Sequence, residues 1–64
     1  MNEEQALSSI EALRKQEISE LTIKKTDFLF FRDILVKQED FKHFRGIAQR
    51  GGDILYHYSE TPRS

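Results

Sequence analysis

Three side chains in the middle of the chain have the types and spacing that could bind a metal ion. Glu39 and His43 are four residues apart and Asp40 and His43 three, so on a helix all three would share one face. Zinc requires three or four ligands, but the chain has no cysteine and only one other histidine, His57. We therefore interpret this cluster as a helix N-terminus with a solvated histidine, and we expect neither a metal nor a cofactor.

Basic side chains further along could contact phosphate groups. Lys42, Arg45 and Arg50 lie in residues 21–50, which contain seven basic and four acidic residues. Residues 1–20 have the opposite balance, two basic and five acidic. The asymmetry fits either nucleic-acid binding or an acidic first helix that packs on a basic later segment. Because four nearby acids dilute the positive charge, we treat nucleic-acid binding through Lys42, Arg45 and Arg50 as the alternative function.

Catalytic motifs find no support in the sequence. Ser8 and Ser9 have no base nearby in the sequence, and neither a glycine-rich phosphate loop nor a nucleophile elbow occurs. A chain of 64 residues also has little room for an enclosed pocket beside its core. We expect that the protein is not an enzyme.

The composition fits one small domain. The 64 residues carry a formal net charge of -1, with 38% hydrophobic and 33% charged residues. We expect a folded unit over residues 1–58 and a flexible tail over residues 59–64. The longest apolar run, residues 28–31, is far too short to span a membrane. The absence of cysteine rules out disulfides and fits a cytoplasmic protein.

The first segment predicts a helix. Asn2 is a favourable N-cap, and Gln5 occupies the position of a capping box. The regular pattern extends to about position 21, and its apolar stripe consists of Ala6, Leu7, Ile10, Leu13, Ile18 and Leu21.

A second helix is expected to begin at Thr26 or Asp27. From residue 28 to residue 36, apolar side chains occur on every side, interrupted only by Arg32 and Asp33. A helix of this kind is normally covered by neighbours, and one N-terminal helix is too little to cover it. We therefore predict a homodimer or larger assembly. The predicted core and self-association surface consists of Phe28, Phe31, Ile34 and Leu35.

Residues 41–48 favour a third helix. The stripe with helical spacing consists of Phe41, Phe44, Ile47 and Ala48. This segment could also continue the second helix without a break. Gly51 is expected to end it as the residue after the C-cap, with Arg50 at the negative end of the helix.

Two short segments admit more than one structure. Residues 21–25 fit either a short strand or a last helical turn with a tight connection, and we favour the helical alternative. Residues 53–58 favour an extended segment against the helices, which could pair with residues 21–25. Tyr56 and Tyr58 would pack on the core or belong to a partner surface, and we favour packing.

The sequence thus predicts a mostly all-α fold, a bundle of two or three helices with a short extended C-terminal segment and at most a minor two-stranded pairing. The predicted function is that of a cytoplasmic protein–protein interaction module, a regulator or accessory subunit. Its expected partners are a second copy of itself and another protein, with nucleic acid as the alternative and no membrane.

Overall fold

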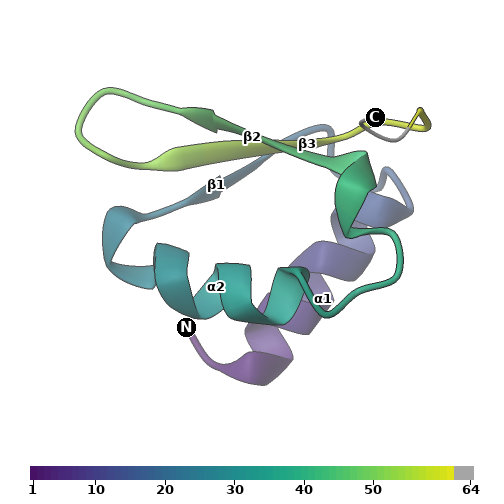
Figure 1. The fold of residues 1–64 in the computed structure, drawn as a ribbon, viewed down its shortest axis with the longest axis horizontal. Helices are drawn as coiled ribbons and strands as arrows, with labels where there is room; N and C mark the ends of the chain where they lie inside the picture. Colours follow the sequence, from purple (N-terminus) through teal and green to yellow (C-terminus); the bar gives the residue numbers. More distant parts are fainter. Residues whose placement is uncertain (62–64) are drawn as a thin grey trace.

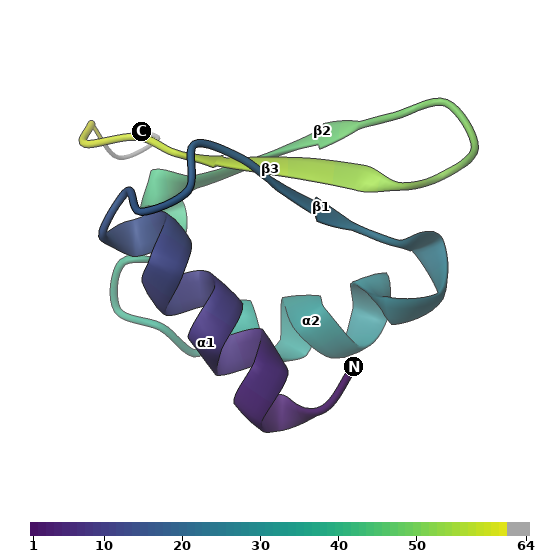
Figure 2. The same cartoon turned by 180° about the vertical axis from the view of Figure 1, so that it is seen from behind.

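Two helices pack against one face of a three-stranded antiparallel sheet in the computed structural model, which describes residues 1–61 (Figure 1). The other face of the sheet is not covered by either helix, as the reverse view also shows (Figure 2). The elements in chain order are α1 (Glu3–Arg14), β1 (Leu21–Ile23), α2 (Phe28–Leu35), β2 (Phe44–Ala48) and β3 (Ile54–Tyr58). Short 3-10 turns at Lys25–Asp27 and Phe41–His43 precede α2 and β2.

This architecture is α+β, so the predicted all-α bundle is wrong. Strand order in the sheet is β1-β3-β2, which places the last strand of the chain in the middle. Within residues 1–61, no helix combines the length and apolar character that crossing a membrane requires.

The N-terminus of α1 confirms the predicted cap. The side chain of Asn2 accepts a hydrogen bond from the Gln5 amide at 2.8 Å, and the Gln5 side chain accepts one from the Asn2 amide at 3.2 Å. These reciprocal bonds satisfy two backbone donors that a helix N-terminus otherwise leaves without partners.

The C-terminus of α1 comes earlier than predicted, at Arg14 instead of near Leu21. Gln16 has a φ of 61°, in the left-handed region, and its amide donates to the carbonyl of Leu13. The next amide, of Glu17, donates to the carbonyl of Ala12. This pair of bonds is a Schellman motif, which usually has glycine where Gln16 stands. The absence of glycine explains why the sequence did not reveal the stop.

The third predicted helix is wrong, since residues 44–48 form strand β2. In β2, Phe44 is buried while Arg45 and Ile47 are exposed on the outer face. The inward positions are therefore 44, 46 and 48. Because Gly46 has no side chain, the alternation of apolar and polar residues that marks a strand is not visible in the sequence. What remained was the spacing of Phe41, Phe44 and Ile47, which a helix also fits.

Gly51 does not end a helix but lies in the hairpin loop between β2 and β3. The amide of Gly52 donates to the carbonyl of Gln49, and Gly51, the third residue of this turn, has a φ of 92°. A positive φ at that position is what a type II turn requires, and glycine provides it without steric cost.

The two ambiguous segments pair as strands. The register places Leu21 opposite Tyr56 and Ile23 opposite Ile54, so the helical turn that we favoured for residues 21–25 is wrong. The alternation of residues 53–58 does correspond to an extended segment, and it forms the central strand.

Every helix and strand contributes to the buried core. The core residues are Ala6, Ile10, Leu13, Ile23, Phe31, Leu35, Phe44 and Tyr56. The ring of Phe31 lies 5.3 Å from that of Tyr56, between centroids, at an interplanar angle of 48°. The face of α2 that carries Phe31 and Leu35 is therefore covered by the sheet and α1 of the same chain.

The predicted tail begins with an ordered contact. The amide of Ser59 donates to the carbonyl of His43 at 2.8 Å, which extends the β2–β3 ladder by one pair. Residues 62–64 of the predicted tail lie outside the described residues.

Candidate functional site

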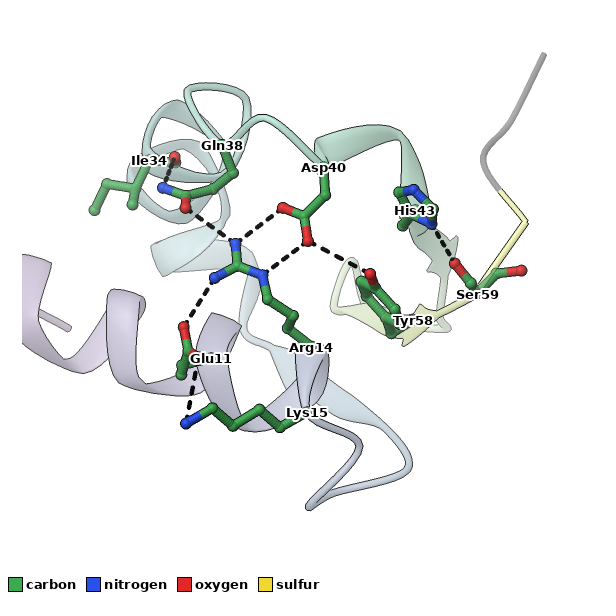
Figure 3. Close-up of polar contacts among 9 residues, drawn as sticks. All are labelled: Glu11, Arg14, Lys15, Ile34, Gln38, Asp40, His43, Tyr58 and Ser59. Carbon is green, nitrogen blue, oxygen red and sulfur yellow. Dashed lines mark hydrogen bonds and ion pairs between the residues drawn. The ribbon is translucent and has the colours of Figure 1, made fainter.

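A cluster of hydrogen bonds centred on Arg14 joins α1 to the segment after α2 (Figure 3). Arg14 donates to both carboxylate oxygens of Asp40, from Nε at 2.7 Å and from Nη2 at 2.9 Å. Its other donors reach Glu11 at 2.8 Å and the side-chain oxygen of Gln38 at 3.1 Å. All three nitrogens of this guanidinium thus donate hydrogen bonds to side chains of the same chain.

The charges within this cluster stabilise each other. The hydrogen bond from Arg14 lowers the pKa of Asp40 below its ordinary value, and the same bond raises the pKa of Arg14. Partial desolvation, with the nearby Asp40 charge, raises the pKa of Tyr58, whose hydroxyl lies 3.5 Å from Asp40 Oδ2. A carboxylate held in this way is a weak proton acceptor, so the arrangement suits a structural cross-link.

The residues considered as metal ligands do not meet at one point. Asp40 is bound to Arg14, and His43 Nδ1 donates to the Ser59 carbonyl at 2.7 Å. The His43 ring also stacks on Tyr58, with centroids 5.4 Å apart. In residues 1–61, no three histidine or acidic side chains are grouped so that they could hold a metal ion.

A groove lies between α2 and β2. Its volume is about 340 Å³. Among residues 1–61, Arg32 is the one charged residue of the groove walls, which consist of Phe28, Arg32, Leu35, Val36, Phe41, Phe44, Gly46, Ala48, Ile54 and Tyr56. The groove residues on β2 beyond Phe44, Gly46 and Ala48, are exposed.

Gly46 forms the floor of this groove. A Cβ atom at this position would lie 3.1 Å from Cε1 of Tyr56 and 3.2 Å from Cγ2 of Ile54, closer than ordinary van der Waals contact. The absence of a side chain lets the Tyr56 ring pack directly over the backbone. It also leaves the middle of β2 accessible from the groove.

β2 is an edge strand, and the hydrogen-bond parity shows which of its backbone groups face outward. The amide of Ser59 donates to the carbonyl of His43 at 2.8 Å, and the amide of Gln49 donates to the carbonyl of Asp53 at 2.7 Å. In an antiparallel ladder every second residue bonds to the same neighbour. Odd-numbered residues of β2 therefore bond to β3, and even-numbered residues direct their amides and carbonyls away from the sheet.

The amide and carbonyl groups of Gly46 and Ala48 consequently point outward at the open edge. The side chain of Ala48 and the bare Cα of Gly46 line the groove. A row of outward backbone groups beside an apolar groove is the geometry that accepts an additional strand.

The predicted self-association residues lie mostly inside one chain. Phe31 and Leu35 are buried, and Phe28 and Ile34 are half-buried against the core. The large apolar side chains that α2 and its C-cap leave exposed are Leu29 (73%), Phe30 (43%) and Val36 (42%).

The two tyrosines differ in burial. Tyr56 belongs to the core, whereas Tyr58 is half-buried and packs edge-on against Phe44, with ring centroids 5.1 Å apart. Both positions are consistent with the packing role that we favoured.

The predicted phosphate contacts do not share one helix face. Lys42 belongs to a 3-10 turn, Arg45 to the outer face of β2, and Arg50 to the hairpin loop, and all three are exposed. The ion pairs within residues 1–61 are formed by the N-terminus, Arg14 and Lys15, and none involves these three cations.

A family model described as YkzS-like protein matches residues 3–57, from the first residue of α1 almost to the end of β3. The chain belongs to the YkzS-like protein family. No curated protein and no solved structure matches the chain. The YkzS-like match includes the groove and the open edge of β2, and it assigns no activity to them.

The helical interpretation of residues 41–48 conceals the groove. One signal could have revealed it. The segment 49–53 contains two consecutive glycines between apolar runs, a pattern also typical of a hairpin. With that interpretation, Gly46 and Ala48 would have fallen on one face of a strand.

Proposed function

We propose that this protein is a small protein–protein interaction module without catalytic activity, which binds an extended polypeptide at the groove beside β2. The observation that carries the proposal is the coincidence of outward backbone groups at Gly46 and Ala48 with an apolar groove of about 340 Å³. Backbone pairing would give affinity, and the groove would select alternate side chains of the ligand. A cytoplasmic location is part of the same proposal.

Selection from a displayed library of random eight-residue peptides tests this function. We expect enriched peptides that bind the wild-type protein, and we expect Ala48→Pro to weaken that binding at least about tenfold. Proline removes the outward amide at Ala48 without breaking a bond to β3, because edge strands accept proline where the amide faces solvent.

Thr22→Pro is the matched control on the opposite edge of the sheet. Odd-numbered residues of β3 bond to β2, so Ile54 and Tyr56 bond to β1. The amide of Thr22, opposite Leu55, therefore points outward. No residue of β1 lines the groove. This variant should bind the selected peptides as the wild type does. A library that yields no binder, or binders that Thr22→Pro and Ala48→Pro weaken equally, would refute the groove as the binding site.

Self-association through the outer face of α2 is a second candidate. It is favoured by Leu29 and Phe30, two large apolar side chains that are adjacent and exposed. Sedimentation velocity should then show a dimer that Leu29→Glu converts to a folded monomer, because the charge would be desolvated in the interface. A wild-type protein that stays monomeric at all accessible concentrations contradicts this candidate.

A further inference from the structure

The charges around the groove indicate the chemistry of its ligand. Residues 42–50 contain Lys42, Arg45 and Arg50 and no acidic residue, although the whole chain has a net charge of -1. Arg32 adds a fourth cation from α2 at the wall of the groove. None of the four takes part in an ion pair within residues 1–61.

We propose that the strand that pairs with β2 is an acidic segment of another protein, with carboxylates alternating with apolar side chains. This inference rests on the proposed function and specifies the partner. Side chains opposite Gly46 and Ala48 would enter the groove, where the walls are apolar. Side chains opposite Arg45 would lie on the outer face of the sheet, where a carboxylate pairs with the guanidinium.

A second copy of β2 is a poor occupant of the same edge. In the antiparallel register centred on Gly46, Arg45 of one copy lies opposite Ile47 of the other and gains no carboxylate partner. The antiparallel register centred on Arg45 places the Arg45 side chains of the two copies opposite each other. Like charges directly opposite each other destabilise a strand pair, and β2 contains no acidic residue that could pair with Arg45, so a second copy satisfies this cation in neither register.

Three synthetic heptapeptides test the inference, each acetylated and amidated, with valine at the second, fourth and sixth positions. The other four positions are all glutamate, all glutamine or all lysine. We expect the glutamate peptide to bind about tenfold more tightly than the glutamine peptide, with affinity that falls as salt is added. The lysine peptide should not bind, and Arg45→Glu should reverse the order of the charged peptides.

The outcomes separate this inference from the function on which it rests. If the glutamate and glutamine peptides bind equally and Ala48→Pro weakens both, the groove binds strands but the acidic partner is refuted. The acidic partner is also refuted if none of the three heptapeptides binds while peptides selected from the library do. An oligothymidylate that binds more tightly than any peptide, and loses affinity in Arg45→Glu but not in Ala48→Pro, would assign these cations to nucleic acid instead.

Discussion

Phe31→Ala should unfold a large fraction of the protein at 25 °C. The Phe31 side chain is fully buried, and its ring packs against Tyr56 at 5.3 Å between centroids. Truncating a buried phenylalanine costs about 3–5 kcal/mol, because it removes buried apolar area and leaves a cavity. A domain of this size has a total stability of only about 3–10 kcal/mol. Urea denaturation followed by circular dichroism measures the loss.

Leu29→Ala is the matched control for this prediction. Leu29 belongs to the same helix but is 73% exposed, so in the monomeric protein its truncation should change the stability by no more than about 0.5 kcal/mol. Equal denaturation midpoints for the two variants would mean that α2 does not face the sheet as described.

Arg14→Met should destabilise the protein by about 2 kcal/mol at neutral pH, because it leaves the half-buried Asp40 carboxylate without its two charged hydrogen bonds. A double-mutant cycle with Asp40→Asn should give a coupling energy of about 1–2 kcal/mol. Lys15→Met is the control, since Lys15 is 61% exposed and contacts Glu11 only at 3.5 Å, and it should be nearly neutral. Additive effects of Arg14→Met and Asp40→Asn would contradict a direct interaction.

The same pair predicts an acid-dependent stability. Since the pKa of Asp40 is lowered on folding from an ordinary value of 3.8, the unfolded chain binds the proton more readily than the native protein does. The stabilisation is therefore complete above that value and is lost as the pH falls through the lowered pKa. Arg14→Met should show a shallower decline in this window, and identical acid profiles for variant and wild type would refute the prediction.

The structure of a segment can be predicted from the sequence where its residue pattern fits only one kind of secondary structure. α1 was predictable at its N-terminus, because a capping box needs only Asn2 and Gln5 and involves no distant contact. Its C-terminus was not, because Gln16 takes a left-handed conformation that its residue type does not favour. Both boundaries are formed by local hydrogen bonds, but only the first uses the residue types that usually mark it.

The strands were harder to predict because their stabilisation comes from distant partners. β1 has three residues and pairs with β3, more than thirty positions further along the chain. Without that pairing, residues 21–23 have no preference strong enough to exclude a helical turn. The groove could not be predicted for the same reason, because Phe28 and Ala48 line one cavity only after β2 has joined the sheet.

The position of β3 in the sheet has a consequence for how the chain acquires its structure during synthesis. β3 is the last strand in chain order, yet it lies between β1 and β2 and supplies Tyr56 to the core. Until residues 54–58 have left the ribosome, neither β1 nor β2 has a strand to pair with, and α2 has no sheet to cover it. α1 can form early from its own caps, whereas the three-stranded sheet and its contacts with α2 can be completed only after β3 emerges.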